Sequence, residues 1–584
     1  MMERSKFRGL RRLIRDESGD AMVIAIIASM LMVLLPLPLL ASSFSDVPLA
    51  QSETNFQRAM GAIDAGISDY MNRLNQASVS QAGNYWQYSS TNLPPDGNTA
   101  FTGWAQVPGT SSEYFHYNVM NSSSIASTGD VVLQVTGLST LGSPSAERTV
   151  DVTLQSRGFL QNMLMWNISM LDPQLAQSAG SGLSASEAQA ECAYGWDQPN
   201  PSATGDDSDS SYGESEANSS APNSTYGPDL TECAGLLNYY GTGNTFNGPV
   251  FSNDIYYIYG QPIFNGPVFS ASTRTTAYAV GSNDTHPYWV DAQCWPGGIC
   301  NGDNPIFNSG GAIKQSTKLP LPTSDSELIT IAKTAGCYYQ GPTQIDLSGS
   351  TMTVISPETP AGMNQANCLG SSIPLPPNGV AYVDGTASTS SCTAALTGTG
   401  YSSPPNGCAN GDVFIQGKLT GQLTIASADS IYITGDLVYT NCAASGSSDA
   451  LGLIANEFVY ISNHFGSSNV TTDSCTGHSS QNPVVYGAIL ALNHSFGVDG
   501  FWNLTNTTSD TIYFTGSMSA DFMDIEGEFS GTTLVRGYNM SYNYDQRLKY
   551  LSPPYFLSSV AAAWYQANFT EITNPAAASL PNLP

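Results

Sequence analysis

The sequence contains little positive charge. Its 584 residues include 18 Lys+Arg against 47 Asp+Glu, a net charge of −29, and charged residues make up 11% of the chain, where globular domains average about 25%. A surface that binds nucleic acid needs clustered cations to release the counterions of the phosphate backbone. Only eight cations occur from Gly158 to the end of the sequence, so the composition excludes nucleic acid as a partner.

The few cations are concentrated at the start of the sequence. Six of them, accompanied by one acid, lie within the first fifteen residues: Arg4, Lys6, Arg8, Arg11, Arg12 and Arg15. A basic tip before an anionic body is typical of an exported protein tethered to a membrane. The hydrophobic content of 41% and aromatic content of 10% are sufficient for a core, which excludes general disorder.

Familiar catalytic and metal-binding motifs are also absent. The sequence has no G-x-S-x-G, Walker loop, G-x-G-x-x-G, C-x-x-C or H-x-x-x-H pattern, so we predict no catalytic residue, no cofactor and no metal site. The enzymatic alternative is a polysaccharide lyase or hydrolase built on a β-helix, whose site needs carboxylates gathered on one face. The nearby candidates are Asp412, Asp429, Asp436 and Lys418.

An uncharged run of 21 residues, from Ala21 to Ala41, follows the basic tip. A helix of this length can cross a hydrocarbon core of about 30 Å, and the preceding cations place the N-terminus in the cytoplasm and the body outside. Pro36 and Pro38 predict a kink. A cleaved secretory signal is the alternative, but its apolar core has only about 7–15 residues. We expect a single-pass helix whose partner is the lipid bilayer through residues 21–41.

The helical pattern continues beyond this run as an amphipathic stripe. Apolar residues recur at spacings of three and four, with charged residues between them: Phe56, Met60, Ile63, Ile67, Tyr70 and Leu74. Such a stripe needs a partner surface. It can pack on a head domain of the same chain, on equivalent helices of neighbouring subunits, or on each at a different height. We predict Phe56, Met60, Ile63 and Ile67 as helix-packing residues.

These features together resemble a PilX-type minor type IV pilin, most closely the large actinobacterial-style members. The resemblance rests on the basic leader with Glu17-Ser18-Gly19, the apolar span, the stretch Ala59–Asn75 (AMGAIDAGISDYMNRLN) and Tyr85-Trp86. It implies that a prepilin peptidase cuts after Gly19, leaving Asp20 as the first residue, and that the helix then packs among other pilin-like subunits. Two positions depart from the family pattern. Asp20 stands where an apolar residue is usual, and Ile24 stands where major pilins carry Glu.

Three short runs with strand alternation follow the helix: Tyr114–Met120, Val131–Leu138 and Arg148–Gln155. Turn-forming residues separate them, which predicts an antiparallel meander in a pilin-like head. After the head, Asp206–Thr225 is acidic, rich in Ser and without periodicity, and we expect a solvated loop. Its spacing misses the calcium-loop pattern because Tyr212 occupies the glycine position.

Two short sequence motifs, which we call the first and second repeated word, each occur twice with the same period of 18 residues. The heptapeptide FNGPVFS occurs at Phe246–Ser252 and again at Phe264–Ser270, and I-x-G-x-L occurs at Ile415–Leu419 and Ile433–Leu437. A fixed short period with alternating strands indicates a β-solenoid, in which each coil covers the inner face of the previous one. Two hairpins with a local duplication are the alternative.

All ten cysteines lie in the predicted exported part, and their even number favours disulfides formed in an oxidising compartment. Ten cysteines allow many pairings, and we expect neighbours in sequence to pair: Cys192 with Cys233, Cys294 with Cys300, Cys337 with Cys368, Cys392 with Cys408, and Cys442 with Cys475.

The expected fold is mainly β with a long N-terminal α-helix: a pilin-like helix and antiparallel meander, followed by a β-solenoid. The expected organisation is a leader at 1–19, a transmembrane and amphipathic helix at 20–76, a head at 77–175, an acidic loop at 176–235, a solenoid at 236–560 and a tail at 561–584.

The function that fits best is structural, with no enzymatic activity. We expect a pilin-like protein of the cell membrane that assembles through its N-terminal helix with other subunits or the pilus assembly machinery. It would display the solenoid at the cell surface, where a glycan or another surface is a candidate ligand. The alternatives are a permanently anchored adhesin and the polysaccharide-active enzyme.

Overall fold

The computed structural model describes residues 20–34, 36–79, 85–120, 130–141, 145–156, 158–195, 233–273, 289–291, 303–363, 367–388, 392–442, 447–463, 465, 482–504, 511–530, 533–559, 564–572 and 581. The fold over these residues is mainly β, with a few helices. Gly19, the acidic stretch Asp206–Thr225 and three of the cysteines, Cys294, Cys300 and Cys475, lie outside the described residues.

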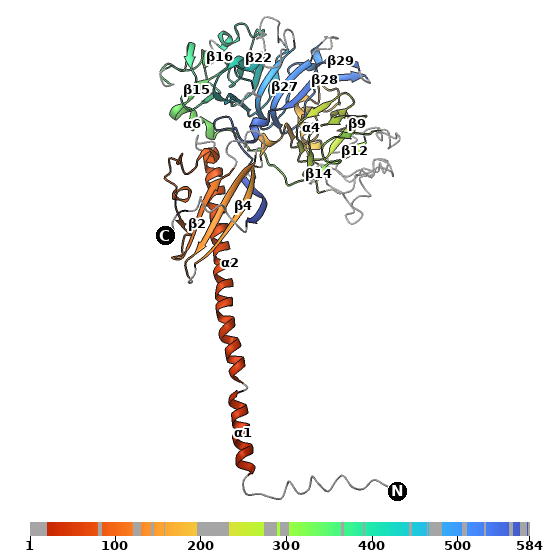
Figure 1. The fold of residues 1–584 in the computed structure, drawn as a ribbon. Coiled ribbons are helices and arrows are strands. Elements are labelled where there is room, and N and C mark those ends of the chain that lie inside the picture. Colours follow the sequence, from red (N-terminus) through yellow and green to blue (C-terminus); the bar gives the residue numbers. More distant parts are fainter. Residues whose placement is uncertain are drawn as a thin grey trace, which may run out of the picture.

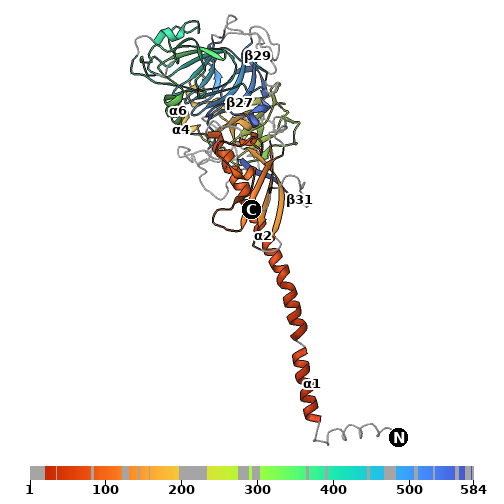
Figure 2. The same cartoon turned by 60° about the vertical axis from the view of Figure 1, so that its left-hand side comes forward.

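The expected single N-terminal helix is divided into two, α1 (Asp20–Leu34) and α2 (Pro36–Val79). Proline lacks a backbone N–H and has a fixed φ, so Pro36 suits the first position of α2. α1 and the N-terminal part of α2 extend away from the rest of the molecule (Figures 1 and 2). Within the described residues, we find no helix that is at once long enough and apolar enough to cross a membrane.

The head is a five-stranded sheet in the order β1 (Ala105–Gln106), β2 (Glu113–Val119), β3 (Val131–Ser139), β4 (Ala146–Ser156) and β31 (Trp564–Ile572). All of its pairings are antiparallel, which confirms the three predicted strands. The C-terminal half of α2 packs on this sheet (Figure 1). Gly137 lets the two meet closely, because a side chain there would overlap the backbone carbonyl of Ala59.

The placement of residues 561–584 as a tail was wrong for β31. This strand forms the edge of the head sheet, with Trp564 paired to Ser156 and Ile572 to Thr149. Everything between β4 and β31 is therefore an insertion between two neighbouring strands of one sheet. This insertion, which we call the body, lies above the head in Figure 1.

The body is organised around a 21-stranded mixed sheet in which most neighbours are parallel. The first repeated word forms β7 (Thr245–Asn247) and β8 (Val250–Ser252), and its copy forms β10 (Ile263–Phe264) and β11 (Val268–Ser270). Each copy lies directly on the other, with Phe246 opposite Phe264 and Val250 opposite Val268. The next layer is β13 (Ile306–Phe307) and β14 (Lys314–Gln315). The predicted stacking with a period of 18 residues is confirmed for the two copies of the first repeated word, but not for the next layer, where Ile263 pairs with Ile306.

Two ladders of side chains run through these layers. The rings of Tyr542, Phe246, Phe264 and Phe307 stack in sequence, with successive centroids 5.5, 5.0 and 5.3 Å apart. On the exposed face, each asparagine amide donates to the amide oxygen of the layer beneath: Asn308 to Asn265 at 2.7 Å, Asn265 to Asn247 at 2.7 Å, and Asn247 to Asn543 at 3.2 Å. The repeated heptapeptide supplies the two middle layers of both ladders, and residues 542–543 and 307–308 extend them.

The second repeated word keeps its register only in part. It lies on β20 (Val413–Leu419) and β22 (Ile431–Tyr439), where Ile415 pairs with Ile433 as the period predicts. The register then shifts, and Gly417 lies opposite Leu437 rather than Gly435. Gly417 has a φ of 114°, a left-handed conformation that glycine adopts readily and that is typical of such irregularities.

One layer of the body is built from two distant parts of the chain. β5 (Leu164–Trp166) pairs with β8 on one side and β27 (Thr511–Ala520) on the other, while β30 (Asn539–Tyr544) pairs with β7 and β27. The chain thus enters and leaves the body in the same layer. β5 precedes the predicted start of the body at residue 236.

From this layer the strands continue in two directions. One arm ends at β14. The other arm ends near β15, and Figure 1 shows these two strands on opposite sides of the body with β27 between them. The second arm comprises β15 (Cys337–Gln340), β16 (Thr343–Gly349), β17 (Thr351–Ile355), β18 (Gly370–Pro374), β19 (Val380–Asp384), β20, β21 (Gln422–Ser427), β22, β23 (Ala450–Ala455), β24 (Val459–Ile461), β25 (Val484–Ala491) and β26 (Phe496–Val498).

Smaller elements cover the flanks of the body: the helices α4 (Ala185–Glu191) and α6 (Glu327–Ala335), the parallel strands β6 (Tyr240–Gly241), β9 (Tyr256–Tyr259) and β12 (Trp289–Asp291), and the hairpin β28 (Gly527–Ser530) and β29 (Thr533–Gly537). Three predicted disulfides are confirmed: Cys192–Cys233, Cys337–Cys368 and Cys392–Cys408. Cys442 is also disulfide-bonded.

The stacking makes a prediction about the glycine of the first repeated word. A methyl group at Gly266 would overlap the backbone carbonyl of Gly248 in the layer beneath. We expect Gly266→Ala to lower the free energy of unfolding by about 1–3 kcal/mol, because backbone strands cannot separate without losing their hydrogen bonds. Urea unfolding followed by tryptophan fluorescence measures this.

The matched control is Gly61→Ala on α2, where nothing lies within 4 Å of the added methyl group. There the same substitution should be neutral or stabilise by up to about 1 kcal/mol, because alanine favours the helix. Equal effects at the two sites would contradict the close stacking of layers.

Candidate functional site

The predicted helix-packing residues lie against the head of the same chain. Ile63 and Ile67 are buried in the core formed by α2 and the head sheet, and Met60 is half-buried against it. Phe56 is half-buried, with the Arg148 guanidinium 4.8 Å from the centre of its ring. The amphipathic stripe is thus occupied at these positions.

The apolar surface that remains uncovered lies on α1, which begins at Asp20. Over residues 22–32 its large apolar side chains are all exposed, with 49% to 79% of their surface accessible: Met22, Val23, Ile24, Ile26, Ile27, Met30, Leu31 and Met32. Consecutive residues on a helix point about 100° apart, so these side chains surround the helix instead of forming one face. A helix that is apolar on all sides is stable when other helices or lipid surround it.

Two of the carboxylates considered for catalysis lie together. The side-chain amide of Asn406 donates to Asp412 Oδ1 at 3.0 Å and to Asp429 Oδ1 at 2.7 Å. Burial, reinforced by the charge of Asp429, raises the pKa of Asp412 to about 8, and burial also raises the pKa of Asp429. The pair therefore holds a proton near neutral pH.

The other two candidates do not join this pair. Asp436 is buried, and its Oδ1 accepts a hydrogen bond from the backbone N–H of Val484 at 3.0 Å, which serves the fold. Lys418 lies on β20 opposite Ser348 and Val438. Of the four residues that the enzymatic alternative considered, the structure joins Asp412 and Asp429 through Asn406, whereas Asp436 and Lys418 lie further along β22 and β20.

A second cluster of charged side chains connects Asp172, which follows β5, to the loop between β23 and β24 and the loop between β25 and β26. His494 makes ion pairs with Asp172 through Nδ1 at 2.9 Å and with Glu457 through Nε2 at 2.8 Å, and its ring stacks on Phe458. Burial alone would lower the pKa of His494, but the hydrogen bonds and charges of the two carboxylates outweigh it and raise the pKa to about 10. The imidazolium is thus permanently charged at neutral pH and acts as a structural link.

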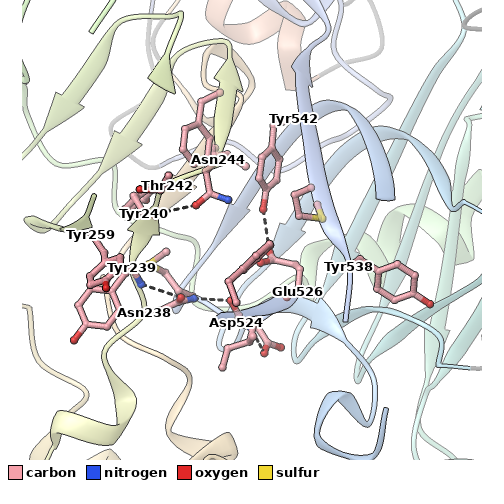
Figure 3. Close-up of a pocket in the computed structure, with 18 of the residues that line it drawn as sticks. Asn238, Tyr239, Tyr240, Thr242, Asn244, Tyr259, Asp524, Glu526, Tyr538 and Tyr542 are labelled. Atoms are coloured by element: carbon pink, nitrogen blue, oxygen red, sulfur yellow. Dashed lines mark hydrogen bonds between the residues drawn. The ribbon is translucent and has the colours of Figure 1, made fainter. Parts of the chain in front are cut away.

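A cavity of about 360 Å³ lies beside the layer that β5 and β30 share (Figure 3). Its lining comes from β5, from residues 238–246 with Tyr259, from residues 523–529, and from residues 538–542. Eight of the lining residues have aromatic rings: Trp166, Tyr239, Tyr240, Phe246, Tyr259, Phe529, Tyr538 and Tyr542. The volume falls within the range of small-molecule sites, about 300–1,000 Å³.

Several polar groups of this cavity bond with one another, and of these Asp524 and Tyr542 are buried. The Tyr542 hydroxyl donates to Glu526 Oε1 at 3.2 Å, and Figure 3 shows the two side chains directed at each other. The amide of Asn238 donates to the backbone oxygen of Asp524 at 2.7 Å, and the amide oxygen of Asn244 accepts from the Gly241 N–H at 2.7 Å. Burial raises the pKa of Glu526 to about 7 and that of Asp524 well above its usual range.

Sequence reasoning missed this cavity. Its residues come from segments that lie between Leu164 and Tyr542, and none of the segments has a recognisable motif. The only available signal was the unusual density of tyrosines in Asn238–Tyr240 and Tyr538–Tyr544, which by itself is equally typical of a packed core.

The carboxylate pair makes a prediction about pH. The unfolded chain ionises Asp412 near pH 4, whereas the folded chain retains the proton up to about pH 8, so this residue lowers stability progressively as the pH rises between these values. Asp412→Asn removes the titratable carboxyl group and keeps a side-chain oxygen that accepts the hydrogen bond from the Asn406 amide. We expect the variant to match the native protein in thermal midpoint at pH 4 and to exceed it at pH 8.

The control is Asp64→Asn at an exposed position of α2, which should leave the difference between pH 4 and pH 8 unchanged. An Asp412→Asn protein that is no more stable than the native protein at pH 8 would show that Asp412 is ionised in the fold.

Comparison with solved structures gives only weak similarity. The crystal structure of the competence-associated pilin ComZ from Thermus thermophilus matches with a TM-score of 0.29 and 12% sequence identity, over 88% of this chain and 97% of that chain. No family model and no curated protein matches the sequence. A similarity of this size carries no argument about function.

Proposed function

We propose that this chain is an exported, pilin-like structural protein that assembles through α1 into a fibre or its assembly complex. The observation that carries the proposal is the uncovered apolar surface of α1. Eight large apolar side chains between residues 22 and 32 have 49% to 79% of their surface exposed in the described part of the chain. Apolar surface in water costs about 25 cal/mol per Å², so such a helix requires a partner, either lipid or the equivalent helices of other subunits.

α1 suits assembly into a fibre because it lies apart from the folded head (Figure 1). The head is closed by its own core around Ile63, Ile67 and Tyr70, so docking of α1 requires no rearrangement of the head. In this proposal α1 is held by the bilayer before assembly and by neighbouring helices afterwards. Cleavage after Gly19 would leave Asp20 as the N-terminus of the mature subunit.

The body is the displayed part. Parallel layers in register, linked by aromatic and asparagine ladders, support the interpretation of the body as a β-solenoid. Disulfides at Cys192–Cys233, Cys337–Cys368 and Cys392–Cys408 suit an oxidising exterior. The low number of cations leaves the body strongly anionic, which favours solubility at a cell surface. No chemical step is proposed.

Assembly can be tested with a charge on the uncovered helix. Ile27 is 53% exposed, and Ile27→Asp should abolish recovery of the protein in fibres sheared from the native host. Its urea unfolding should differ from the native protein by less than about 0.5 kcal/mol, because the side chain makes no contact with the folded head. The control is Glu53→Gln, an exposed residue on α2, which should assemble normally.

N-terminal sequencing of the exported protein separates the pilin from its alternative. A mature start at Asp20 supports assembly after processing. A chain that still begins with Met1 and stays in the membrane fraction would identify a permanently anchored surface protein instead.

A further inference from the structure

The lining of the cavity beside β5 and β30 is aromatic and acidic. Eight of its residues have aromatic rings, and Asp524 and Glu526 contribute carboxyl groups. Among the described residues that line the cavity, none is Lys, Arg or His. A phosphate or carboxylate ligand would lose its hydration without meeting a cation. The lining therefore excludes an anionic ligand and favours a cation.

Glu526 is the carboxyl group of the lining that can pair with a cation near neutral pH. Its Oε1 accepts the hydrogen bond from the Tyr542 hydroxyl at 3.2 Å, and burial raises its pKa to about 7. A positive charge beside it would stabilise the carboxylate further. Asp524 is more deeply buried, and burial raises its pKa well above its usual range, so Asp524 is the weaker partner for a cation.

Aromatic rings lie on both sides of this carboxyl group. Figure 3 shows Tyr239 and Tyr259 on one side of Glu526 and Tyr538 on the other. The rings of Tyr239 and Tyr259 are inclined at 57°, with their centroids 6.4 Å apart. A ring face attracts a cation that lies within about 6 Å of its centroid. An organic cation in this cavity therefore gains from the rings as well as from the carboxylate.

The hydrogen-bond acceptors of the lining distinguish between kinds of organic cation. The backbone oxygen of Asp524 already accepts a bond from the Asn238 amide, and the amide oxygen of Asn244 already accepts one from the Gly241 N–H. A primary ammonium brings three N–H donors, each of which needs an acceptor when it leaves water. A quaternary ammonium has no N–H group and presents methyl groups to the rings. The lining therefore fits a quaternary ammonium better than a primary amine.

We propose that this cavity binds a quaternary ammonium compound of about the size of choline that carries no anionic group. Tyr259 and Phe529 line the cavity and are 48% and 39% exposed, which places the cavity at the surface of the body. All the described lining residues belong to the body, so binding does not depend on α1 or on fibre assembly.

The first test compares a charged ligand with its uncharged analogue. The probes are choline and neohexyl alcohol, in which a carbon atom replaces the charged nitrogen of choline. Isothermal titration calorimetry measures their binding to the purified full-length chain at pH 8, above the pKa of Glu526. The chain is kept in a maltoside detergent, which has no ammonium group. We expect choline to bind at least tenfold more tightly. Equal binding of the two probes, or no binding of choline at millimolar concentration, would overturn the proposal.

Two further probes test the selection among ammonium compounds. Ethanolamine has a primary ammonium group in place of the methylated one, and phosphocholine adds a phosphate group. Each should bind at least tenfold more weakly than choline. If ethanolamine binds as tightly as choline, the methyl groups are not recognised. If phosphocholine does so, the lining does not exclude an anion. Either result would overturn the proposal.

Glu526→Gln removes the charge of the carboxyl group and keeps an acceptor for the Tyr542 hydroxyl. It should weaken choline binding at least tenfold and leave the binding of neohexyl alcohol unchanged. The matched control is Glu528→Gln, the same change at an exposed residue that does not line the cavity, and it should bind choline as the native chain does. Equal affinities of the two variants for choline would contradict pairing with Glu526.

The contribution of the rings is measured at Tyr259. Because about half of this side chain is exposed, its replacement leaves the core intact, and it tests the site even where Glu526→Gln fails to fold. Tyr259→Leu should weaken choline binding about threefold or more. Tyr259→Phe retains the ring and should bind choline with native affinity. Native affinity in Tyr259→Leu would contradict recognition by the rings and overturn the proposal.

Discussion

The pairing of β4 with β31 is the constraint on which the rest of the structure depends. Because Trp564 lies opposite Ser156, the two ends of the body are fixed next to each other at one edge of the head sheet. The body must therefore begin and end in the same place, and it does so in the layer where β5 and β30 lie between β27 and the first repeated word. Closing so long an insertion costs only a logarithmic amount of entropy, which the many layers of parallel pairing can offset.

Parts of this arrangement could be predicted because the sequence repeats the physical cause. Identical words bury identical side chains, and parallel stacking in register places Phe246 over Phe264 and Asn265 over Asn247, as the period of 18 residues indicates. The stripe of Ile63, Ile67, Tyr70 and Leu74 likewise reports a buried helix face directly. The predicted register failed at Gly417, where the pairing of β20 with β22 shifts. Such a local irregularity of the backbone does not change the spacing of the repeated residues in the sequence.

Other parts have no local signal. β31 is exposed along nearly its whole length, so its sequence lacks the alternation by which a half-buried strand is recognised. The cavity depends on Trp166, Tyr240 and Glu526 meeting across three segments, and each of these residues is unremarkable in its own neighbourhood. Pro36 and Pro38 predicted a kink in a single N-terminal helix, whereas the structure has two helices, α1 and α2, because hydropathy does not describe backbone geometry.

The double attachment of the body also has a mechanical consequence. A domain joined by a single linker transmits any pull through one covalent strand and can swivel about it. Here a pull on the body reaches the head through β4 and β31 together. Each strand resists sliding past its neighbour because several hydrogen bonds hold the two strands at once. The load is shared between two strands in shear, and rotation of the body about the head is restrained. A surface subunit built in this way would keep its displayed face in a constant orientation under flow.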